Sequence, residues 1–291
     1  MSLFYGPAAR RSAPARNLDR MSIRFPHGAL VPEIGIGTWF VGDVPARRDE
    51  EIAAIRAGLD AGLSVVDTAE MYGDGRSERL VGEAIAGRRD DVFLVSKVLP
   101  HRADAAGVRR AVQQSLQRLG TDRLDLYLLH WRGGVPVDET VAAFERLQRD
   151  GDILAWGVSN FDAEDLAELP PGCATDQVLY NPIRRGPELD LFPVLRARQI
   201  PVMAYSPLEQ ARLLDDPGLA ELAGSLGVSP AQLVLAWVVR TGDVLTIPKA
   251  ATVTHALENA AAGELSLDDD VLAELDALFP APRHPVPLEM L

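Results

Sequence analysis

The feature that most constrains the fold is a regular alternation of short apolar runs and segments with helical periodicity. The apolar runs lie at residues 34–39, 64–67, 92–98, 124–130, 153–159, 175–180, 200–205 and 244–247. Helical segments lie between them, for example 104–119, 138–149, 163–169 and 188–198. Strands that alternate with helices in this way indicate a parallel sheet. Because eight such units have the size of a barrel, we predict a (β/α)8 TIM barrel of the α/β class.

Further elements are expected before, within and after the barrel. Residues 22–25 and 29–31 flank Pro26-His27-Gly28 and predict an N-terminal β-hairpin. Residues 217–226 and 230–240 predict two helices before the eighth strand, and 268–279 predicts a helix ahead of a proline-rich tail. No linker-like segment interrupts residues 21–291, so we expect a single barrel domain there.

Residues 1–20 are expected to be a disordered extension, or a stretch upstream of a start at Met21. The pair Arg10-Arg11 invites an export-signal interpretation, but no apolar segment follows it.

Composition disfavours several classes of partner. The net charge of −13 argues against a nucleic-acid surface, which needs a basic face. No apolar run reaches membrane-spanning length. The single cysteine, Cys173, excludes intrachain disulfides, and the five histidines show no pair at metal-ligand spacing. We therefore expect a cytoplasmic monomer with no metal, membrane or nucleic-acid partner.

Polar residues stand at the ends of four successive predicted strands. They are Asp67, Lys97, His130 and the pair Ser159-Asn160, one strand-helix unit apart. In such barrels the carboxyl ends of the strands carry the active site. Asp67 could instead cap the next segment, and His130 could be an ordinary core histidine. Lys97 is harder to dismiss, because a buried lysine is seldom unpaired and Asp67 is a ready partner.

Tyr72 completes a chemically coherent set at this rim. Its phenol has an ordinary pKa near 10, and a cation in contact would favour the phenolate by about 4 kcal/mol, equivalent to about three pKa units. Lys97 can supply that cation, Asp67 can keep it charged, and His130 can orient a carbonyl oxygen. Together these groups describe an acid that protonates an oxygen with developing negative charge, as hydride addition to a carbonyl requires.

At this point the sequence resembles the aldo/keto reductase family over residues 21–279, and most of all its bacterial members that reduce methylglyoxal and similar small aldehydes. The resemblance rests on motifs in a characteristic order: Gly35-Ile-Gly-Thr-Trp39, Asp67-Thr-Ala-Glu-Met-Tyr72-Gly, Lys97, Leu128-Leu-His130-Trp131, Gly157-Val-Ser-Asn160-Phe161, Gln177 with Asn181-Pro182, Tyr205-Ser-Pro-Leu208, and Ile247-Pro-Lys249 followed by Glu258-Asn259.

The resemblance implies a role for each matching residue. Asp67, Tyr72, Lys97 and His130 correspond to the catalytic tetrad, with Tyr72 as the general acid, and Trp39 and Trp131 correspond to walls of the substrate pocket. The positions that bind NADPH correspond to Gly37, Thr38, Asp67, Ser159, Asn160, Gln177, Tyr205, Ser206, Leu208, Ile247, Lys249, His255, Glu258 and Asn259. Of these, Lys249 would meet the 2′-phosphate, and the chain has only one other lysine, Lys97. No Gly-x-Gly-x-x-Gly motif supports a Rossmann mode of cofactor binding.

The chain departs from the family pattern near the expected 2′-phosphate. Members that bind this phosphate tightly have an arginine at the position of His255, and a hydroxyl side chain at that of Ala250. Histidine is largely neutral above pH 6.5, so the phosphate loses a permanent charge and a bidentate donor. We expect a preference for NADPH over NADH that is weaker than that of the family's tight binders, with NADH as a possible cofactor.

The substrate is expected to be a small aldehyde, ketone or α-dicarbonyl. The connections after His130 and after Tyr205 look short, which favours an open pocket, and residues 283–288 could close over it. Arg132 and Arg283 could favour acidic substrates, although a solvated surface role is the better interpretation.

Two other functions keep part of this chemistry. One is a regulatory barrel that senses a nicotinamide dinucleotide with little turnover. The other is an aldolase-type barrel in which Lys97 forms a Schiff base.

Overall fold

A closed parallel barrel forms the centre of the molecule in the computed structural model, which describes residues 22–291. Its strands are β3 (Ile36–Gly37), β4 (Val65–Asp67), β5 (Phe93–Val98), β6 (Leu124–Leu129), β7 (Ile153–Ser159), β8 (Asp176–Leu179), β9 (Val202–Tyr205) and β10 (Val244–Thr246). Neighbours in sequence are neighbours in the sheet, and every pairing is parallel. Parallel bridges of Ile34 with Thr246 and of Gly37 with Lys249 join the first strand to the last.

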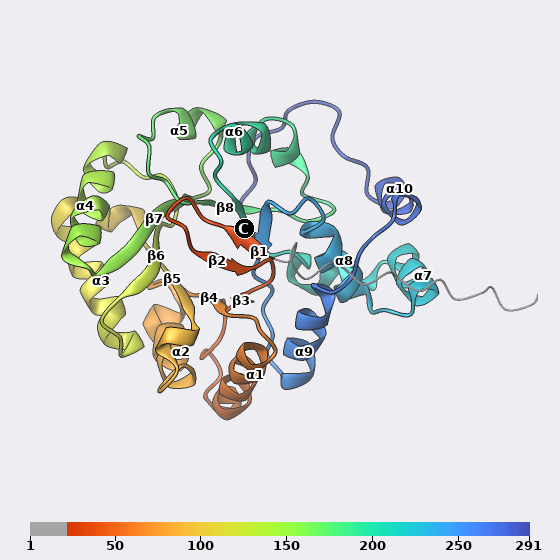
Figure 1. The fold of residues 1–291 in the computed structure, drawn as a ribbon, viewed down its shortest axis with the longest axis horizontal. Coiled ribbons are helices and arrows are strands. Elements are labelled where there is room, and N and C mark those ends of the chain that lie inside the picture. Colours follow the sequence, from red (N-terminus) through yellow and green to blue (C-terminus); the bar gives the residue numbers. More distant parts are fainter. Residues whose placement is uncertain (1–21) are drawn as a thin grey trace, which may run out of the picture.

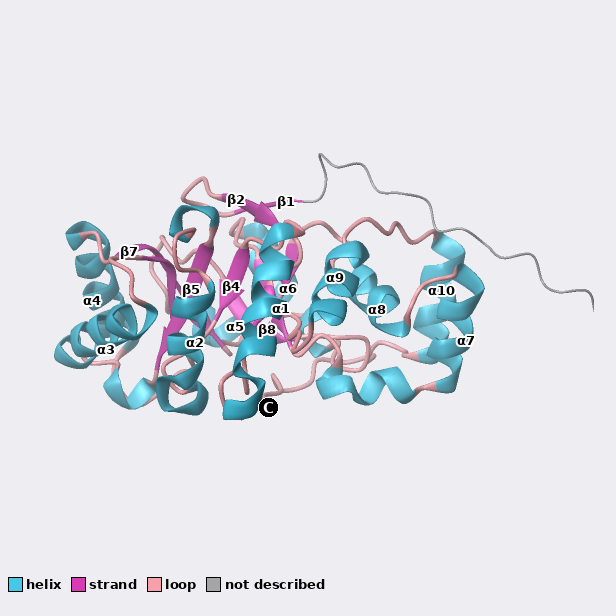
Figure 2. Ribbon diagram, turned by 90° about the horizontal axis from the view of Figure 1, so that it is seen from below, coloured by secondary structure: helices cyan, strands magenta, loops and turns pink. Residues whose placement is uncertain are grey.

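A β-hairpin covers one end of the barrel. Its strands, β1 (Ser22–Arg24) and β2 (Leu30–Pro32), pair antiparallel, as the sequence predicts. Figure 2 shows the hairpin on one side of the barrel and the C-terminus on the opposite side. Ile23, Phe25 and Val31 of the hairpin pack against apolar side chains that point into the barrel, among them Val95 and Leu126. The hairpin therefore excludes water from this end, and the site must lie at the other.

Helices surround the barrel (Figure 1). They are α1 (Arg48–Asp60), α2 (Arg76–Ala84), α3 (Ala105–Leu119), α4 (Val137–Asp150), α5 (Ala163–Ala167), α6 (Leu191–Ala197), α7 (Pro217–Leu226), α8 (Pro230–Val238), α9 (Val253–Ala262) and α10 (Asp269–Leu278). A second, larger apolar core lies between these helices and the outer face of the strands.

Local sequence signals set the ends of several helices. Asp104 caps α3 by accepting a hydrogen bond from Gly107 N at 2.7 Å, and α3 ends at Gly120, whose φ of 64° suits glycine. Ser229 and Gln232 form a reciprocal capping box at the start of α8, where Pro230 occupies the first turn. These caps satisfy backbone groups that the helices leave unpaired.

The predicted architecture is confirmed, with small differences in the elements. The helices α7 and α8 precede β10, and α10 follows α9, as expected. The first strand covers only Ile36–Gly37, and the segment predicted at 188–198 divides into a 3-10 turn, Gly186–Glu188, and α6. The expectation for residues 1–20 lies outside the described residues. Within residues 22–291 no single helix is long and apolar enough for a membrane span; only α7 and α8 together, bent by 89°, meet such a criterion.

Candidate active site

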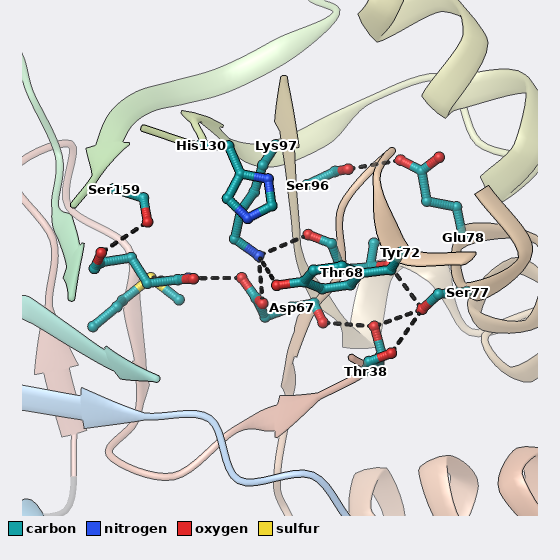
Figure 3. Close-up of polar contacts among 12 residues, drawn as sticks. Thr38, Asp67, Thr68, Tyr72, Ser77, Glu78, Ser96, Lys97, His130 and Ser159 are labelled. Atoms are coloured by element: carbon teal, nitrogen blue, oxygen red, sulfur yellow. Dashed lines mark hydrogen bonds and ion pairs between the residues drawn. The ribbon is translucent and has the colours of Figure 1, made fainter. Parts of the chain in front are cut away.

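Lys97 is the centre of a buried polar cluster at the end of the barrel opposite the hairpin. It lies on β5 with no exposed surface. Its Nζ donates hydrogen bonds to Asp67 Oδ2 at 2.6 Å, to the backbone oxygen of Thr68 at 3.0 Å and to the Tyr72 hydroxyl at 3.1 Å (Figure 3). An ammonium has three protons to donate, so this geometry uses all of them. A Schiff base at Lys97 would require the loss of all three bonds, which argues against the aldolase interpretation.

Asp67 forms the anionic side of the cluster. It ends β4, is buried, and accepts from Lys97 on one oxygen and from Gln177 Nε2 at 2.8 Å on the other. Burial raises the pKa of the Asp67 carboxyl, and the charge of Lys97 offsets only part of that rise. Burial alone would lower the pKa of Lys97, but the Asp67 carboxylate outweighs it and raises that pKa. The predicted pairing of these two residues is present in the structure.

Tyr72 begins the short 3-10 helix Tyr72–Gly75 that follows β4. Its hydroxyl faces Lys97, whose Nζ also lies 4.8 Å from the centre of the phenol ring. Lys97 lowers the pKa of this phenol, as the sequence predicts, but it does not decide the net pKa. Burial raises the pKa of Tyr72 above its ordinary value, because desolvation outweighs the lowering by Lys97. The negative charge of Asp67 raises the pKa further. In this structure the phenol is therefore held in its protonated form.

A cluster of buried hydroxyl groups supports the segment that carries Asp67 and Tyr72. Thr38 Oγ1 donates to the backbone oxygen of Asp67 at 2.8 Å, and Ser77 Oγ donates to Thr38 Oγ1 at 2.8 Å. The Thr68 hydroxyl lies 3.1 Å from Ser77 Oγ (Figure 3). Thr38, expected to contact the cofactor, thus also joins β3 to β4 beneath the cluster. This gives the chain a rigid base for the Tyr72 loop.

His130 directly follows β6 and lies against Tyr72, with ring centroids 5.8 Å apart. It is almost fully buried, and its Nδ1 has no hydrogen-bond partner within the described chain. Burial, aided by the positive charge of Lys97, lowers the pKa of His130 to about 2. The imidazole is therefore neutral at physiological pH and can donate a hydrogen bond from only one nitrogen.

Ser159, Asn160 and Tyr205 form the side of the site contributed by β7 and β9. Asn160 has a left-handed φ of 59°, and its Nδ2 donates to the backbone oxygen of His130 at 3.1 Å. The Tyr205 hydroxyl donates to Asn160 Oδ1 at 2.9 Å, and Ser159 Oγ donates to the backbone oxygen of Gln177 at 2.8 Å. Since Gln177 Nε2 faces a carboxylate, the amide oxygen is the part of Gln177 left for a ligand N–H group.

Two adjoining cavities open at this rim. One, of about 250 Å³, is lined by Trp39, Met71, Tyr72, His130, Trp131, Ser159, Asn160, Gln177, Tyr205, Met290 and Leu291. The other, of about 400 Å³, is lined by Gly37, Thr38, Trp39, Phe40, Asp67, Tyr72, Tyr205, Ser206, Pro207, Leu208, Gln210, Ala211, Ile247, Pro248 and Lys249. We call them the small pocket and the long groove. Trp39, Tyr72 and Tyr205 line both, so a ligand in the groove can reach the small pocket.

The structure places most of the predicted residues in the lining of these cavities and leaves four outside it, namely Lys97, which is fully buried, and three residues of α9. His255, Glu258 and Asn259 lie on α9, beyond the residues that line the groove. Lys249 lines the groove, and within residues 22–291 no carboxylate comes within ion-pair distance of it. Its nearest aromatic neighbour is Phe40, whose ring centre is 5.7 Å from Nζ.

Other expectations about the pocket need correction. The connection after β9 is not short, because it runs from Ser206 to Asp216 before α7 begins, and part of it lines the groove. The part of the tail that lines the small pocket is Met290 and Leu291 rather than residues 283–288.

The two arginines singled out in the sequence do not line the small pocket. Arg132 pairs with Asp165 at 2.7 Å and with Glu168 at 2.6 Å, which supports a surface role. Arg283 is exposed. In the described part of the chain there is no group of three or more His, Cys, Asp or Glu side chains placed to hold a metal ion.

Several lining residues were missed from sequence. Phe40 follows the recognised Trp39 and could have been found by adjacency. Met71 lies inside the recognised Asp67–Tyr72 stretch. Met290 and Leu291 carry no local signal, because only the path of the tail brings the chain end to the pocket.

The fold and the rim define an oxidoreductase-type barrel, with a buried lysine-carboxylate pair beside a phenol and a groove long enough for an extended ligand. The sequence model described as the aldo/keto reductase family matches residues 33–279. The chain belongs to the aldo/keto reductase family and is an oxidoreductase.

Individual relatives agree with this assignment. A protein of Escherichia coli K12 named methylglyoxal reductase YeaE is 47% identical over 284 residues, which are 94% of this chain and 100% of that protein. A glyoxal reductase of Bacillus subtilis is 32% identical, over 93% of this chain and 97% of its own length. A crystal structure of an aldo/keto reductase from Klebsiella pneumoniae, in complex with NADP and acetate, is 49% identical. It superimposes with a TM-score of 0.91 over 93% of this chain and 99% of its own.

Proposed function

We propose that this protein is an NADPH-dependent reductase of small aldehydes and ketones, among them α-dicarbonyls such as methylglyoxal, and that Tyr72 is its general acid. The observation that carries the proposal is the buried contact of Lys97 Nζ with both the Tyr72 hydroxyl and Asp67. It lies where the small pocket and the long groove meet. The relatives named for methylglyoxal and glyoxal reduction support the substrate class.

The groove fits a nicotinamide dinucleotide. Lys249 lines the groove without an ion-pair partner among residues 22–291, so its cation is suited to a phosphate. A side chain at Gly37 would place its Cβ 2.4 Å from the backbone oxygen of Ile247, so glycine is needed for the first strand to pack this closely on the segment 247–249 that lines the groove. In the adjoining small pocket, Ser159, Asn160 and Gln177 offer the polar groups that a carboxamide needs, and the ring of Tyr205, which lines both cavities, offers a flat surface. The cofactor, when bound, supplies a hydride to the carbonyl carbon.

The residues of the small pocket act on the carbonyl oxygen. Tyr72 gives its hydroxyl proton to the oxygen as negative charge develops there, and the ammonium of Lys97 stabilises the phenolate that remains. A phenol whose pKa is raised by burial is a weaker acid, so the nearby ammonium is needed to favour transfer. The neutral imidazole of His130 donates a hydrogen bond that orients the same oxygen.

Aromatic and apolar walls determine which substrates enter. Trp39, Met71, Trp131, Met290 and Leu291 surround a space of about 250 Å³, which suits a small carbonyl compound rather than a sugar polymer or a peptide. No guanidinium lines this pocket among the described residues, so we expect no preference for acidic substrates.

The test is to follow NADPH oxidation with a panel of small aldehydes, ketones and α-dicarbonyls, using wild type and Tyr72→Phe. Loss of a general acid typically lowers the rate about 100-fold to 10,000-fold. Tyr72→Phe should bind NADPH nearly as well as wild type, measured by fluorescence quenching. Equal rates for both proteins would refute the role of Tyr72, and no turnover of any carbonyl by wild type would favour the dinucleotide-sensing alternative.

The pH profile gives a second check on His130. Because the pKa of His130 is lowered to about 2, this residue stays neutral throughout the ordinary assay range. If the profile of kcat/KM against pH has an inflection near pH 6.5, that inflection should therefore be the same in wild type and in His130→Gln.

The monomeric state and the cytoplasmic location expected from the sequence are also part of this proposal. Size-exclusion chromatography with light scattering tests the monomeric state.

A further inference from the structure

Arg184 occupies a position between the two parts of the chain that complete the cavities. It follows β8, where the backbone of Arg184 pairs with that of Asn181. On one side lies the loop 206–216 that lines the long groove. On the other lies the tail 280–291, which leaves α10, passes α6 and ends near the barrel axis (Figure 1).

Toward the groove, Arg184 holds Glu209. Arg184 Nη2 lies 2.8 Å from Glu209 Oε1, and Asn181 Nδ2 donates to Glu209 Oε2 at 2.8 Å. The Glu209 side chain is 2% exposed, so both of its oxygens depend on these partners. Glu209, Gln210 and Ala211 have left-handed φ angles of 48°, 56° and 71°, which non-glycine residues seldom adopt. The buried carboxylate therefore anchors a strained segment whose next two residues line the groove.

Toward the tail, the same guanidinium holds Glu289. Arg184 Nη1 forms an ion pair with Glu289 Oε1. The following residues, Met290 and Leu291, line the small pocket together with Tyr205.

Neighbours of Arg184 fix the earlier part of the tail. Arg185 Nη1 contacts Asp276 at 2.6 Å and the backbone oxygen of Phe279 at 3.0 Å. Gly186 packs so closely on Val286 that a Cβ there would lie 2.7 Å from it. The tail is thus docked along one loop, with Arg184 as the last fixed point before the pocket.

We propose that Arg184 is a positioning residue that sets the C-terminal wall of the small pocket and ties that wall to the loop over the long groove. The inference rests on the proposed function in that the pocket binds the carbonyl and the groove binds NADPH. Because Met290 and Leu291 narrow the pocket, their fixation by Arg184 selects small substrates. Because Glu209 shares the guanidinium, the groove loop and the wall move together.

The first test measures substrate selectivity in Arg184→Gln, Glu289→Gln and the double variant. The readout is the ratio of kcat/KM for a bulky aromatic aldehyde to that for methylglyoxal. Each single variant should raise the ratio roughly threefold, the size expected for loss of a partly exposed ion pair. The double variant should add nothing further to Arg184→Gln. The matched control is Arg196→Gln, which breaks the exposed ion pair between Arg196 of α6 and Asp243. This variant should leave the ratio unchanged.

The second test separates the two arms of Arg184. Glu289→Gln should leave the Kd for NADPH unchanged, because Glu289 makes no polar contact with the groove loop 206–216. Arg184→Gln should raise that Kd, because Arg184 also holds Glu209. The single ammonium of Arg184→Lys can pair with Glu209 or with Glu289 but cannot bridge both as the guanidinium does. Compared with Arg184→Gln, this variant should recover part of the substrate selectivity or part of the NADPH affinity, but not both. A uniform fall in kcat with an unchanged ratio in both single variants would overturn the proposal.

A third readout does not depend on turnover. In proteins made to end at Leu291, carboxypeptidase should release Leu291 and Met290 faster from Arg184→Gln and Glu289→Gln than from wild type or Arg196→Gln, with mass spectrometry as the measure. If wild type proves inactive but release is accelerated, the proposed function fails while the docking of the wall stands. Equal release rates in all four proteins would contradict the role of Arg184.

Discussion

The side-chain amide of Gln177 donates a hydrogen bond of 2.8 Å to the carboxylate of Asp67, although 110 residues separate them in sequence. The bond crosses the barrel from β8 to β4 and satisfies the Asp67 oxygen that does not face Lys97. A residue expected only to bind the cofactor therefore also stabilises the charged pair behind Tyr72.

Substitutions of Gln177 should separate its role in binding the cofactor from its role in stabilising Asp67, because only the second role makes kcat/KM depend on pH. In Gln177→Glu the new carboxyl can replace the amide donor only while protonated, because two buried carboxylates in contact cannot both ionise. We expect kcat/KM to approach the wild-type value at low pH and to fall about tenfold or more as pH rises and the new group ionises. Gln177→Met, which lacks any donor, is the control and should show a loss that does not vary with pH. Parallel profiles for the two variants would contradict this account.

Lys97 and Asp67 should show strong coupling in stability. Lys97→Met leaves a buried carboxylate without its cation, and breaking such a pair typically costs about 3–5 kcal/mol. Asp67→Asn combined with Lys97→Met removes both charges, so the double variant should unfold at higher urea concentration than Lys97→Met. If the double variant is as unstable as the single one, the pair is not the source of the loss. Both proteins should lack reductase activity, because Tyr72 has lost its cation.

Asp176 is a buried carboxyl group whose neutral replacement should stabilise the protein. It has no exposed surface, and its Oδ2 has no hydrogen-bond partner in the described part of the chain. Burial raises the pKa of Asp176 well above its ordinary value, and only the backbone N–H of Phe161, 3.5 Å from Oδ1, opposes that rise. An unpaired buried polar group of this kind typically costs about 1–3 kcal/mol.

The gain from Asp176→Asn should depend on pH in a defined direction. A carboxyl whose pKa is raised in the folded state destabilises that state increasingly as pH rises above the unfolded pKa of about 3.9. Asp176→Asn should therefore raise Tm at pH 8, and the gain should shrink toward zero as pH falls to 4. Asp122→Asn, which changes an exposed carboxyl, is the comparison and should have little effect at either pH. Destabilisation by Asp176→Asn at pH 8 would show that the carboxyl has a structural partner.

Cofactor preference should respond to His255 and Lys249 in opposite directions. His255→Arg on α9 adds a permanent charge and a bidentate donor for a 2′-phosphate, and a hydrogen bond to a charged group contributes about 1.5–3 kcal/mol. The ratio of kcat/KM for NADPH to that for NADH should rise about tenfold. Lys249→Met should lower the same ratio, and His255→Gln should change it little. A wild-type preference for NADH would refute the role of Lys249 at the phosphate.

The barrel and its rim follow from local sequence. Each strand-helix unit carries its own signals, such as the cap at Asp104 and the capping box at Ser229, so the period of the elements can be read without tertiary information. In a parallel barrel every strand ends at the same rim. The positions of Asp67, Lys97 and His130 at successive strand ends therefore predict that their side chains meet.

Only the tertiary structure decided the electrostatics and the walls of the site. The sequence predicts that Lys97 favours the phenolate of Tyr72, but the net pKa of Tyr72 rises because desolvation depends on how deeply the packed chain buries it. Met290 and Leu291 reach the small pocket because Arg184 and Gly186 hold a tail that is distant in sequence. Strand ends are predictable because the repeat places them locally, whereas burial and tail docking arise from contacts between segments far apart in the chain.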